Sequence, residues 1–467
     1  MRLQYQRVLP YISPVLRRTW PHRRAAVPAA PVPELTDAEP GPEWDPEPFE
    51  DSPPDGSRRR LTRRRMALMA LAAVAVGLAV AYTQKDHYTD NAAELSRSLI
   101  GDENTARVEA WYFRVQDRID RTKYSIFGGE PDPFGGGGVL VSVVPAVERP
   151  PVVYYPIAQG AAALDSEQLR AQLAALNFAT PKPMTLPEVR LLLDEAAEGE
   201  GVWTTAGLPR SNASDILMAK TFVRPDRARP YASVAVLLID ARRVRLHFTG
   251  GTKDPGGDRG VPGPGLIRQE AYSQLLAAWN GGFQGAHGAF GAYGDGQTYR
   301  PLRDGYASLV VMKDGTVKMG AWGDDVSWSD NIESVRQNAI LLVKDGEISS
   351  RVGEGNNTWG YVKVDSTEFI TWRSAVGLTK DGDLLVAAGN SLSAESLAKA
   401  LWAAGAHTAM QLDINNPYVL TSLFFPQPDG SLHAERFVEA MPDSPSRFLK
   451  TQERDFFWVT VDESRYR

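Results

Sequence analysis

Hydrophobic and polar residues follow different patterns in the two parts of this 467-residue chain, and the change falls near residue 231. Residues 233–240 read SVAVLLID, a continuous β-branched run of the length typical of a buried strand. Residues 244–248 alternate between apolar and polar, as a half-buried strand does. The pattern therefore predicts β-sheet from about residue 231 onward.

Turn signals within this part indicate antiparallel pairing. Lys-Asp-Gly occurs at 313–315, 344–346 and 380–382, each time between two apolar runs. Asp-Gly in that setting is a strong hairpin signal, because glycine readily adopts the positive φ that tight turns need. We expect three β-hairpins.

One helix is predicted with both of its ends marked, over residues 394–404. Ser393 can cap its N-terminus, Glu395 complements the helix dipole, and Gly405 stands where a C-terminal glycine belongs. Residues 231–467 are therefore predicted to form an α+β domain, mostly antiparallel sheet with packed helices.

The N-terminal part has a different composition. Residues 1–65 are rich in Pro and Arg and poor in apolar residues, as in a disordered tail. Residues 66–83 form an apolar run preceded by two Arg triplets, which predicts one transmembrane helix with a cytoplasmic N-terminus. A cleaved signal peptide is the alternative, disfavoured by the long preceding tail. We expect a single-pass cell-membrane protein whose main domain is extracytoplasmic.

Residues 84–230 are predicted as an extracytoplasmic helical stalk and a mixed region. Apolar residues spaced by three or four indicate a helix over 86–127, either a stalk or a helix packed on the main domain. Two further helices are predicted at 166–176 and 187–197. The role of this region stays open.

Composition excludes several kinds of site. The chain has no cysteine, so disulfides, thiolate metal sites and a catalytic cysteine are all excluded. Its net charge of −6 gives no support for nucleic-acid binding.

Polar residues gather where one predicted strand ends, in the sequence MQLDINNPYV. Alternation from residue 406 places Gln411 and Asp413 on one face of this strand, with Asn415 and Asn416 just beyond. This cluster is either turn chemistry or the polar rim of a site, and we favour a site.

A second stretch of this kind begins at Asn280-Gly281-Gly282-Phe283. Glycines between 281 and 296 allow a ligand to approach the backbone N–H groups closely. No Walker loop and no dinucleotide-binding fingerprint is present, so nucleotide binding is not expected. A mobile linker is the other interpretation.

The order of these motifs resembles the phosphodiester glycosidase family, the family of the uncovering-enzyme-like domains. The resemblance rests on NGGF, RSAVGLTKDG, a capped helix and GAHTAMQLD, and it covers about residues 231–460. It implies a bacterial, membrane-anchored member that hydrolyses or recognises sugar-1-phosphodiesters in envelope glycans. The implied site residues are Asn280, Gly281, Gly282, Arg373 and Asp413.

The resemblance also implies roles for these residues. Arg373 would bind the phosphate, and Asp413 would act as base, nucleophile or metal ligand. This chain has Ile414-Asn415-Asn416-Pro417 where the family usually has Gly-Gly-Gly-Ser, so Asn415 and Asn416 would supply side-chain contacts to substrate. The second acid is open among three residues of the glycine-rich part, namely His287, Asp295 and Asp304; His287 is also a candidate substrate-binding residue.

Other interpretations stay open beside hydrolysis. Gln411, Asp413 and Asn415 are oxygen donors that could hold a divalent cation, although hydrogen-bonded turn scaffolding is the more common use of such residues. The domain could instead be a catalytically inactive glycan- or protein-binding envelope component, with sugars stacked on tryptophans 322, 328, 359 or 372. A structural envelope subunit with residues 86–230 as its contact surface is the third interpretation.

Overall fold

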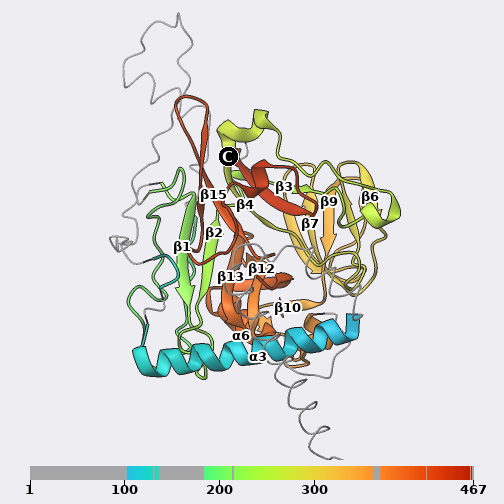
Figure 1. Ribbon diagram of the computed structural model, residues 1–467. Coiled ribbons are helices and arrows are strands. Elements are labelled where there is room, and N and C mark those ends of the chain that lie inside the picture. Colours follow the sequence, from blue (N-terminus) through green and yellow to red (C-terminus); the bar gives the residue numbers. More distant parts are fainter. Residues whose placement is uncertain are drawn as a thin grey trace, which may run out of the picture. The chain divides into compact units, whose positions relative to one another are not determined.

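The computed structural model describes residues 102–129, 132–135, 184–212, 215–360, 369–416, 418–462 and 464. This part of the chain is mostly antiparallel sheet with few helices, as predicted (Figure 1). The expected tail 1–65, span 66–83 and helix 166–176 all lie outside it. Among the described residues, no helix is both long and apolar enough to span a bilayer.

The largest sheet of the described residues has seven antiparallel strands. In spatial order these are β1 (Met218–Val223), β2 (Val234–Ile239), β13 (Leu384–Leu392), β12 (Thr371–Thr379), β14 (Ala406–Ile414), β10 (Leu341–Lys344) and β11 (Glu347–Ile348). Strand β1 precedes residue 231 and pairs along its whole length with β2. The sheet therefore includes a strand from the predicted mixed region.

Two five-stranded sheets complete the β-structure of the described part. One has the order β16 (Leu432–Arg436), β15 (Thr421–Pro426), β4 (Leu275–Asn280), β17 (Phe456–Val461) and β3 (Val244–Thr249). The other has the order β6 (Gln297–Arg300), β5 (Ala292–Gly294), β9 (Ile332–Gln337), β7 (Ala307–Met312) and β8 (Val317–Ala321).

The predicted local elements of this part are confirmed. Each Asp-Gly turn joins two paired strands, namely β7 to β8, β10 to β11 and β12 to β13. Helix α6 (Ala394–Ala403) begins at Ser393, whose side chain accepts the Ser396 backbone N–H, and Gly405 follows it with φ of 93°. Short-range sequence signals were sufficient here, because the hydrogen bonds of each turn and cap are made by residues close by in the sequence.

The hydrophobic core has two main clusters, one on each side of the seven-stranded sheet. One cluster joins α6 to residues such as Val236, Leu385 and Ala409. The other joins Leu237, Val386 and Met410 to the two five-stranded sheets. The seven-stranded sheet is thus buried on both faces, which explains its continuous apolar strands.

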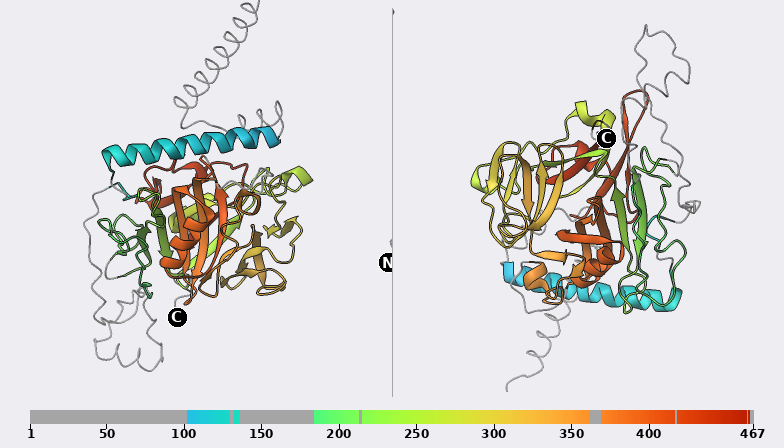
Figure 2. Two further views of the ribbon diagram at one scale, coloured as in Figure 1. Left: turned by 90° about the horizontal axis from the view of Figure 1, so that it is seen from below. Right: turned by 180° about the vertical axis from the view of Figure 1, so that it is seen from behind.

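Helix α3 (Asp102–Phe127) packs against this domain and is not a free stalk. Its Phe113 ring lies 5.9 Å from that of Phe369, and its Asp117 carboxylate pairs with Arg229. The helix runs along one edge of the described residues in all three views (Figures 1 and 2). The remaining helices are short: α5 (Asn356–Trp359), and the 3₁₀ turns η1 (Gly257–Arg259), η2 (Gln269–Gln274) and η3 (Arg447–Leu449).

The helix predicted at 187–197 is wrong, because this segment is irregular. Its backbone bonds to other elements: the Arg190 N–H donates to the Ala403 carbonyl, and the Pro187 carbonyl accepts the Trp203 indole N–H. Tertiary hydrogen bonds replaced the helical ones that the apolar spacing indicated.

Candidate active site

The aspartate predicted at the end of β14 sits in a β-bulge. Arg373 of β12 pairs with Ile414 and Ala375 pairs with Gln411, so two residues of β14 lie opposite Ser374 alone. These two are Leu412 and Asp413. A bulge re-aims side chains locally, and this one turns Asp413 away from the face that carries Gln411. The predicted common face of Gln411 and Asp413 is therefore wrong.

Ser374 ties Asp413 to Asn280 across the two sheets. Its Oγ accepts the Asp413 N–H at 3.1 Å and lies 3.2 Å from the Asp413 carbonyl oxygen. The Asn280 amide donates to the same Oγ at 2.9 Å, and its Oδ1 accepts the Leu420 N–H. Two predicted site residues thus meet through a serine.

The carbonyl groups freed by the bulge have their own partner. Asn338 Nδ2 donates to the carbonyls of Gln411 and Leu412, at 2.8 and 2.7 Å. Its Oδ1 accepts the Phe283 N–H, directly after the paired glycines. Because buried carbonyls need partners, Asn338 stabilises the bulge and connects it to the Asn-Gly-Gly-Phe turn.

The Asp413 carboxylate is buried beside a cation. Its Oδ1 accepts the Ile414 N–H at 2.8 Å, and its Oδ2 accepts a hydrogen bond from the Arg454 guanidinium. That guanidinium lies 4.2 Å from the centre of the Tyr418 ring. Burial raises the pKa of Asp413 to about 6, although Arg454 acts in the opposite direction. Asp413 therefore changes its protonation state just below neutral pH.

A second carboxyl group lies in the same electrostatic field. Burial raises the pKa of Asp254, while the Gly285 N–H, 2.9 Å from its Oδ1, opposes that rise. Arg454, Asp455 and Arg336 act on the pKa values of both Asp254 and Asp413. The site thus holds two carboxyl groups with raised pKa values, a common property of acid–base catalytic groups.

A buried ion pair holds the Asn280-Gly281-Gly282 turn in place. Arg336 donates to both carboxylate oxygens of Asp455, at 2.8 and 3.1 Å. The Gly281 N–H donates to the Asp455 carbonyl, and a Cβ at Gly281 would lie only 1.9 Å from Asp455 Oδ2. The Gly282 N–H faces the same carboxylate at 3.3 Å. Gly281 thus allows close packing on Asp455, Gly282 lies against Arg336 and Asn338, and the N–H groups of both glycines point to Asp455.

Arg373 lies on the opposite side of the sheet from Asp413. Its guanidinium donates to the carbonyls of Leu392, Trp359 and Phe369 and to the Gln411 side chain. These contacts are typical of a structural arginine. The phosphate-binding role implied for Arg373 stays a prediction, and Arg454 is the arginine that touches Asp413.

The other predicted site residues are half-buried or exposed. The Asn415 side chain accepts a hydrogen bond from the Thr371 hydroxyl at 3.0 Å, and the backbone of Asn415 has a φ of 75°. Asn416 is exposed. His287 is half-buried in a turn, and its N–H donates to the Gln284 carbonyl. Asp295 is exposed and accepts the Tyr299 hydroxyl.

The contacts of the predicted oxygen donors separate them. Gln411 bonds to Arg373, Asp413 to Arg454 and Asn415 to Thr371, so the three do not converge on one point. Within the described ranges, no group of three or more His, Asp or Glu side chains is arranged to hold a metal ion. Asp304, the last acid considered, is exposed beside Gly323.

Sequence reasoning missed Asp254, Arg454 and Asp455. None of the three belongs to a motif on which the resemblance rests, and each is more than 40 residues away from Asp413 in the chain. A weak signal existed in Arg454-Asp455, a charged pair directly before the apolar strand β17. Only the fold shows which carboxylates these arginines contact.

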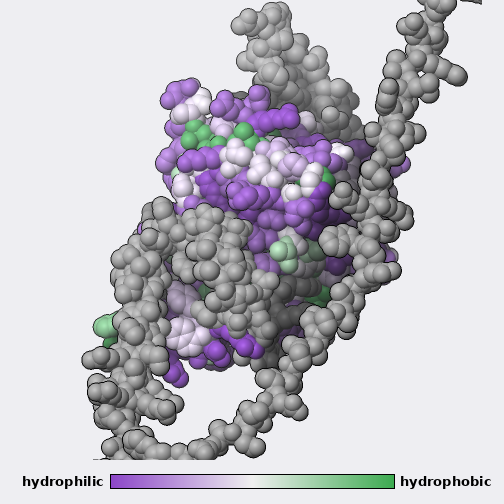
Figure 3. Space-filling model, turned by 45° about the vertical axis from the view of Figure 1, so that its right-hand side comes forward, coloured by the Kyte–Doolittle hydropathy of each residue, from purple (hydrophilic) through white to green (hydrophobic). Residues whose placement is uncertain are grey.

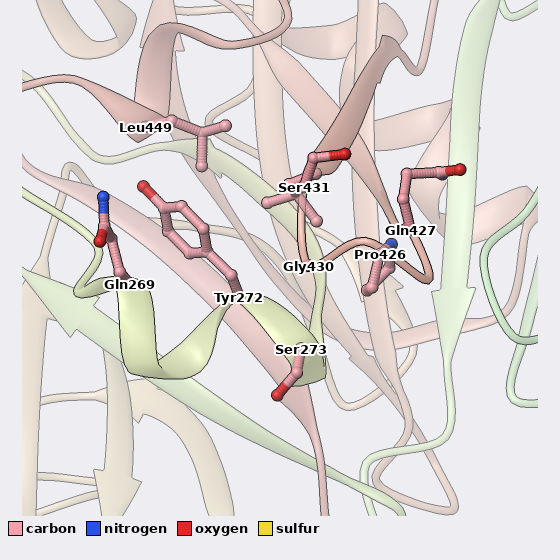
Figure 4. Close-up of a pocket in the computed structure, with 9 residues that line it drawn as sticks. Gln269, Tyr272, Ser273, Pro426, Gln427, Gly430, Ser431 and Leu449 are labelled. Carbon is pink, nitrogen blue, oxygen red and sulfur yellow. The ribbon is translucent and has the colours of Figure 1, made fainter.

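A separate cavity of about 530 Å³ lies away from these groups, between η2 and the β15–β16 hairpin (Figure 4). Tyr272, Gln269 and Leu449 line one side of it, and Ser431 and Gln427 lie on the hairpin. None of the residues that line this cavity is Asp, Glu, Lys or Arg. The cavity thus offers no carboxylate, ammonium or guanidinium group to a ligand.

The fold and the site define a mostly antiparallel α+β protein in which a buried aspartate, Asp413, contacts an arginine, Arg454. Residues 273–413 match the phosphodiester glycosidase family model, so this segment of the chain is a phosphodiester glycosidase domain. The resemblance drawn from the motifs is thereby confirmed for residues 273–413, whereas the membrane anchor stays a prediction. No curated protein matches the chain.

Several solved structures are similar to this chain. The catalytic domain of zebrafish N-acetylglucosamine-1-phosphodiester alpha-N-acetylglucosaminidase, auto-inhibited by its pro-peptide, is 18% identical with a TM-score of 0.35, covering 55% of this chain and 87% of its own. A hypothetical protein from Synechocystis is 11% identical, with a TM-score of 0.27, covering 52% and 62%. A putative exported protein from Burkholderia pseudomallei is 11% identical, with a TM-score of 0.23, covering 49% and 74%.

Proposed function

We propose that this protein is a membrane-anchored, extracytoplasmic hydrolase of sugar-1-phosphodiesters in envelope glycans. The family of residues 273–413 supports the substrate class. The observation that carries the catalytic part is the buried Asp413 carboxylate, hydrogen-bonded to Arg454 and with its pKa raised to about 6. The predicted span at 66–83 supports the location.

The chemistry assigns a different role to each charged group. Arg454 offers a planar cation suited to the phosphate oxygens of the substrate. Asp413, whose ionised form the arginine stabilises, acts at the anomeric carbon as base or nucleophile. Asp254, whose pKa is raised by burial, protonates the leaving phosphate oxygen. Water then completes the products, a free sugar and a phosphomonoester.

The test measures sugar released from a panel of aryl sugar-1-phosphodiesters by the full-length protein. Asp413→Asn and Asp254→Asn are each expected to lower kcat by about 100-fold or more. Asp330→Asn is the matched control, because Asp330 is an exposed aspartate, and it should leave kcat unchanged. Equal activity of Asp413→Asn and the parent would refute the proposal.

The alternative is a catalytically inactive component that binds glycan or protein. The tryptophans offered for sugar stacking give it little support, since Trp322, Trp359 and Trp372 are buried and only Trp328 of the four is exposed. The same panel separates the two functions. Binding of a phosphodiester without release of sugar would favour the inactive component.

A further inference from the structure

Helix α3 presents two faces of different character. One face packs on the domain through Phe113, Asp117 and Tyr124, the last with its ring 5.4 Å from that of Tyr231. At 100° per residue these three positions fall within about 40° of one another. This face accounts for the attachment of the helix to the domain.

The face turned to solvent carries a stripe of large apolar residues. Tyr112, Ile119 and Ile126 follow one another at intervals of seven, about 140° around the helix from the packed face. Trp111 lies beside them. The exposed fractions are 46% for Trp111, 47% for Ile119 and 66% for Ile126. Exposed apolar residues gathered on one surface are a mark of a binding site.

This concentration is specific to α3. Nine large apolar residues are exposed in the part of the chain that the structure describes, and five of them belong to this helix. The face seen in Figure 3 is mostly hydrophilic, with small scattered apolar patches. The surface of α3 is therefore richer in large exposed apolar side chains than the rest of the described surface.

Charge is segregated around the same helix. Between residues 111 and 127, the acidic residues Asp117 and Asp120 are half-buried on the side of the domain, where both act on Tyr231. The basic residues Arg114, Arg118 and Lys123 are exposed, and none of them forms an ion pair with another described residue. The solvent face is thus apolar and basic.

The basic residues border the apolar stripe. Lys123 follows Ile119 by four residues and is its neighbour on the helix surface, and Arg118 lies two turns beyond Trp111 on the same side of the helix. Long basic side chains extend past an apolar face to reach anionic headgroups, while Trp and Tyr rings favour the lipid–water boundary. This pattern is typical of a helix that lies in a membrane interface.

We propose that α3 docks flat on an anionic phospholipid surface through Trp111, Tyr112, Ile119 and Ile126, with Arg118 and Lys123 binding lipid phosphates. The position of the helix in the chain fits this partner. Only residues 84–101 separate it from the predicted span at 66–83, so the helix would begin close to the bilayer. The packed face of α3 would then hold the catalytic domain at a fixed height above the lipid.

The absence of cysteine makes a direct test possible. Single variants Ile119→Cys and Ile126→Cys of the full-length protein carry a spin label and are reconstituted into bilayers of phosphatidylcholine with or without phosphatidylglycerol. Collision with oxygen, which concentrates in lipid, is compared with collision with an aqueous nickel chelate. Leu191→Cys is the matched control, because Leu191 is 48% exposed and lies on a different segment.

The expected result is preferential collision with oxygen at positions 119 and 126 in anionic bilayers, and with nickel at position 191. Arg118→Glu combined with Lys123→Glu should lower the equilibrium constant for docking of α3 on the lipid by about five-fold for each basic residue removed. Higher salt should also reduce it. Unchanged circular dichroism of the double variant would show that α3 is still folded.

Three results would overturn the proposal. Labels at 119 and 126 as aqueous as the label at 191 would exclude lipid contact. Equal oxygen collision in bilayers without anionic lipid, unaffected by the double variant, would exclude the role of the basic residues. Protection from both reagents with dipolar broadening between copies, in detergent alone, would assign the stripe to a second copy of this chain.

Discussion

The ion pair between Arg336 and Asp455 gives the sharpest test of how the site is held together. Both side chains are almost fully buried, with 0% and 1% exposed. Asp455 receives two hydrogen bonds from Arg336 and one from the Gly282 N–H. Asp455→Ala would remove both acceptor oxygens, and with them all three hydrogen bonds, and leave a buried guanidinium without its carboxylate.

The magnitude follows from burial. Breaking a buried pair by removing one partner costs about 3–5 kcal/mol, because the remaining charge stays desolvated. Arg336 would keep its hydrogen bonds to the carbonyls of Gln337 and Phe283, which favours the lower end of that range. Against a typical domain stability of about 5–15 kcal/mol, this is a large loss.

The assay is urea unfolding, followed by the fluorescence of the buried tryptophans. Glu354→Ala is the matched control, because Glu354 forms an ion pair with Arg351 in which both side chains are about half exposed. Its midpoint should scarcely move. A shift for Asp455→Ala no larger than that of Glu354→Ala would show that the pair does not stabilise the fold, and the account of the glycine turn would be wrong.

Further predictions concern separate features of the domain. The His247 ring is stacked on the Trp458 ring at 3.9 Å, and burial lowers the pKa of this histidine to about 4. Because the folded state favours neutral histidine, the stability that is present above pH 6.5 is lost as the pH falls towards 4. His247→Gln should flatten this loss in urea midpoints measured across that range, and an unchanged slope would contradict the assignment. Gly281→Ala places a Cβ 1.9 Å from Asp455 Oδ2 and should lower both the thermal midpoint and activity, whereas Gly353→Ala meets no atom within 4 Å and should be neutral in calorimetry. Ser374→Ala removes the link between Asn280 and Asp413 and should cost about 1–2 kcal/mol, with a drop in kcat larger than the change in KM; equal changes in both would argue against a positioning role.

Local signals predicted the elements of the fold well where neighbours in the chain satisfy them. The turns at 313–315 and 380–382 and the capped helix at 394–404 need only short-range hydrogen bonds, and the structure confirms all three. The helix expected at 187–197 failed because its backbone bonds to Ala403 and Trp203, which are distant in the sequence. Apolar spacing carries no information about such partners.

The site was predicted less completely, for a geometric reason. Alternation along a strand assumes one residue opposite one residue, and Ser374 opposes two. Asp413 was recognised as a site residue, but its partner Arg454 comes from a segment with no motif. Carboxylates and arginines are common in any sequence, and only tertiary structure tells which of them meet in a buried place.

The irregularity in β14 has a consequence for how such a carboxylate can be gained or lost. In a regular pleat, parity would send the aspartate toward α6, away from Arg454 and Asp254. Inserting one residue into β12 beside Ser374, so that Leu412 and Asp413 each face one residue, would restore that parity without altering any side-chain type elsewhere. A one-residue insertion would therefore move this carboxylate away from Arg454 while every sequence motif of the domain stays recognisable.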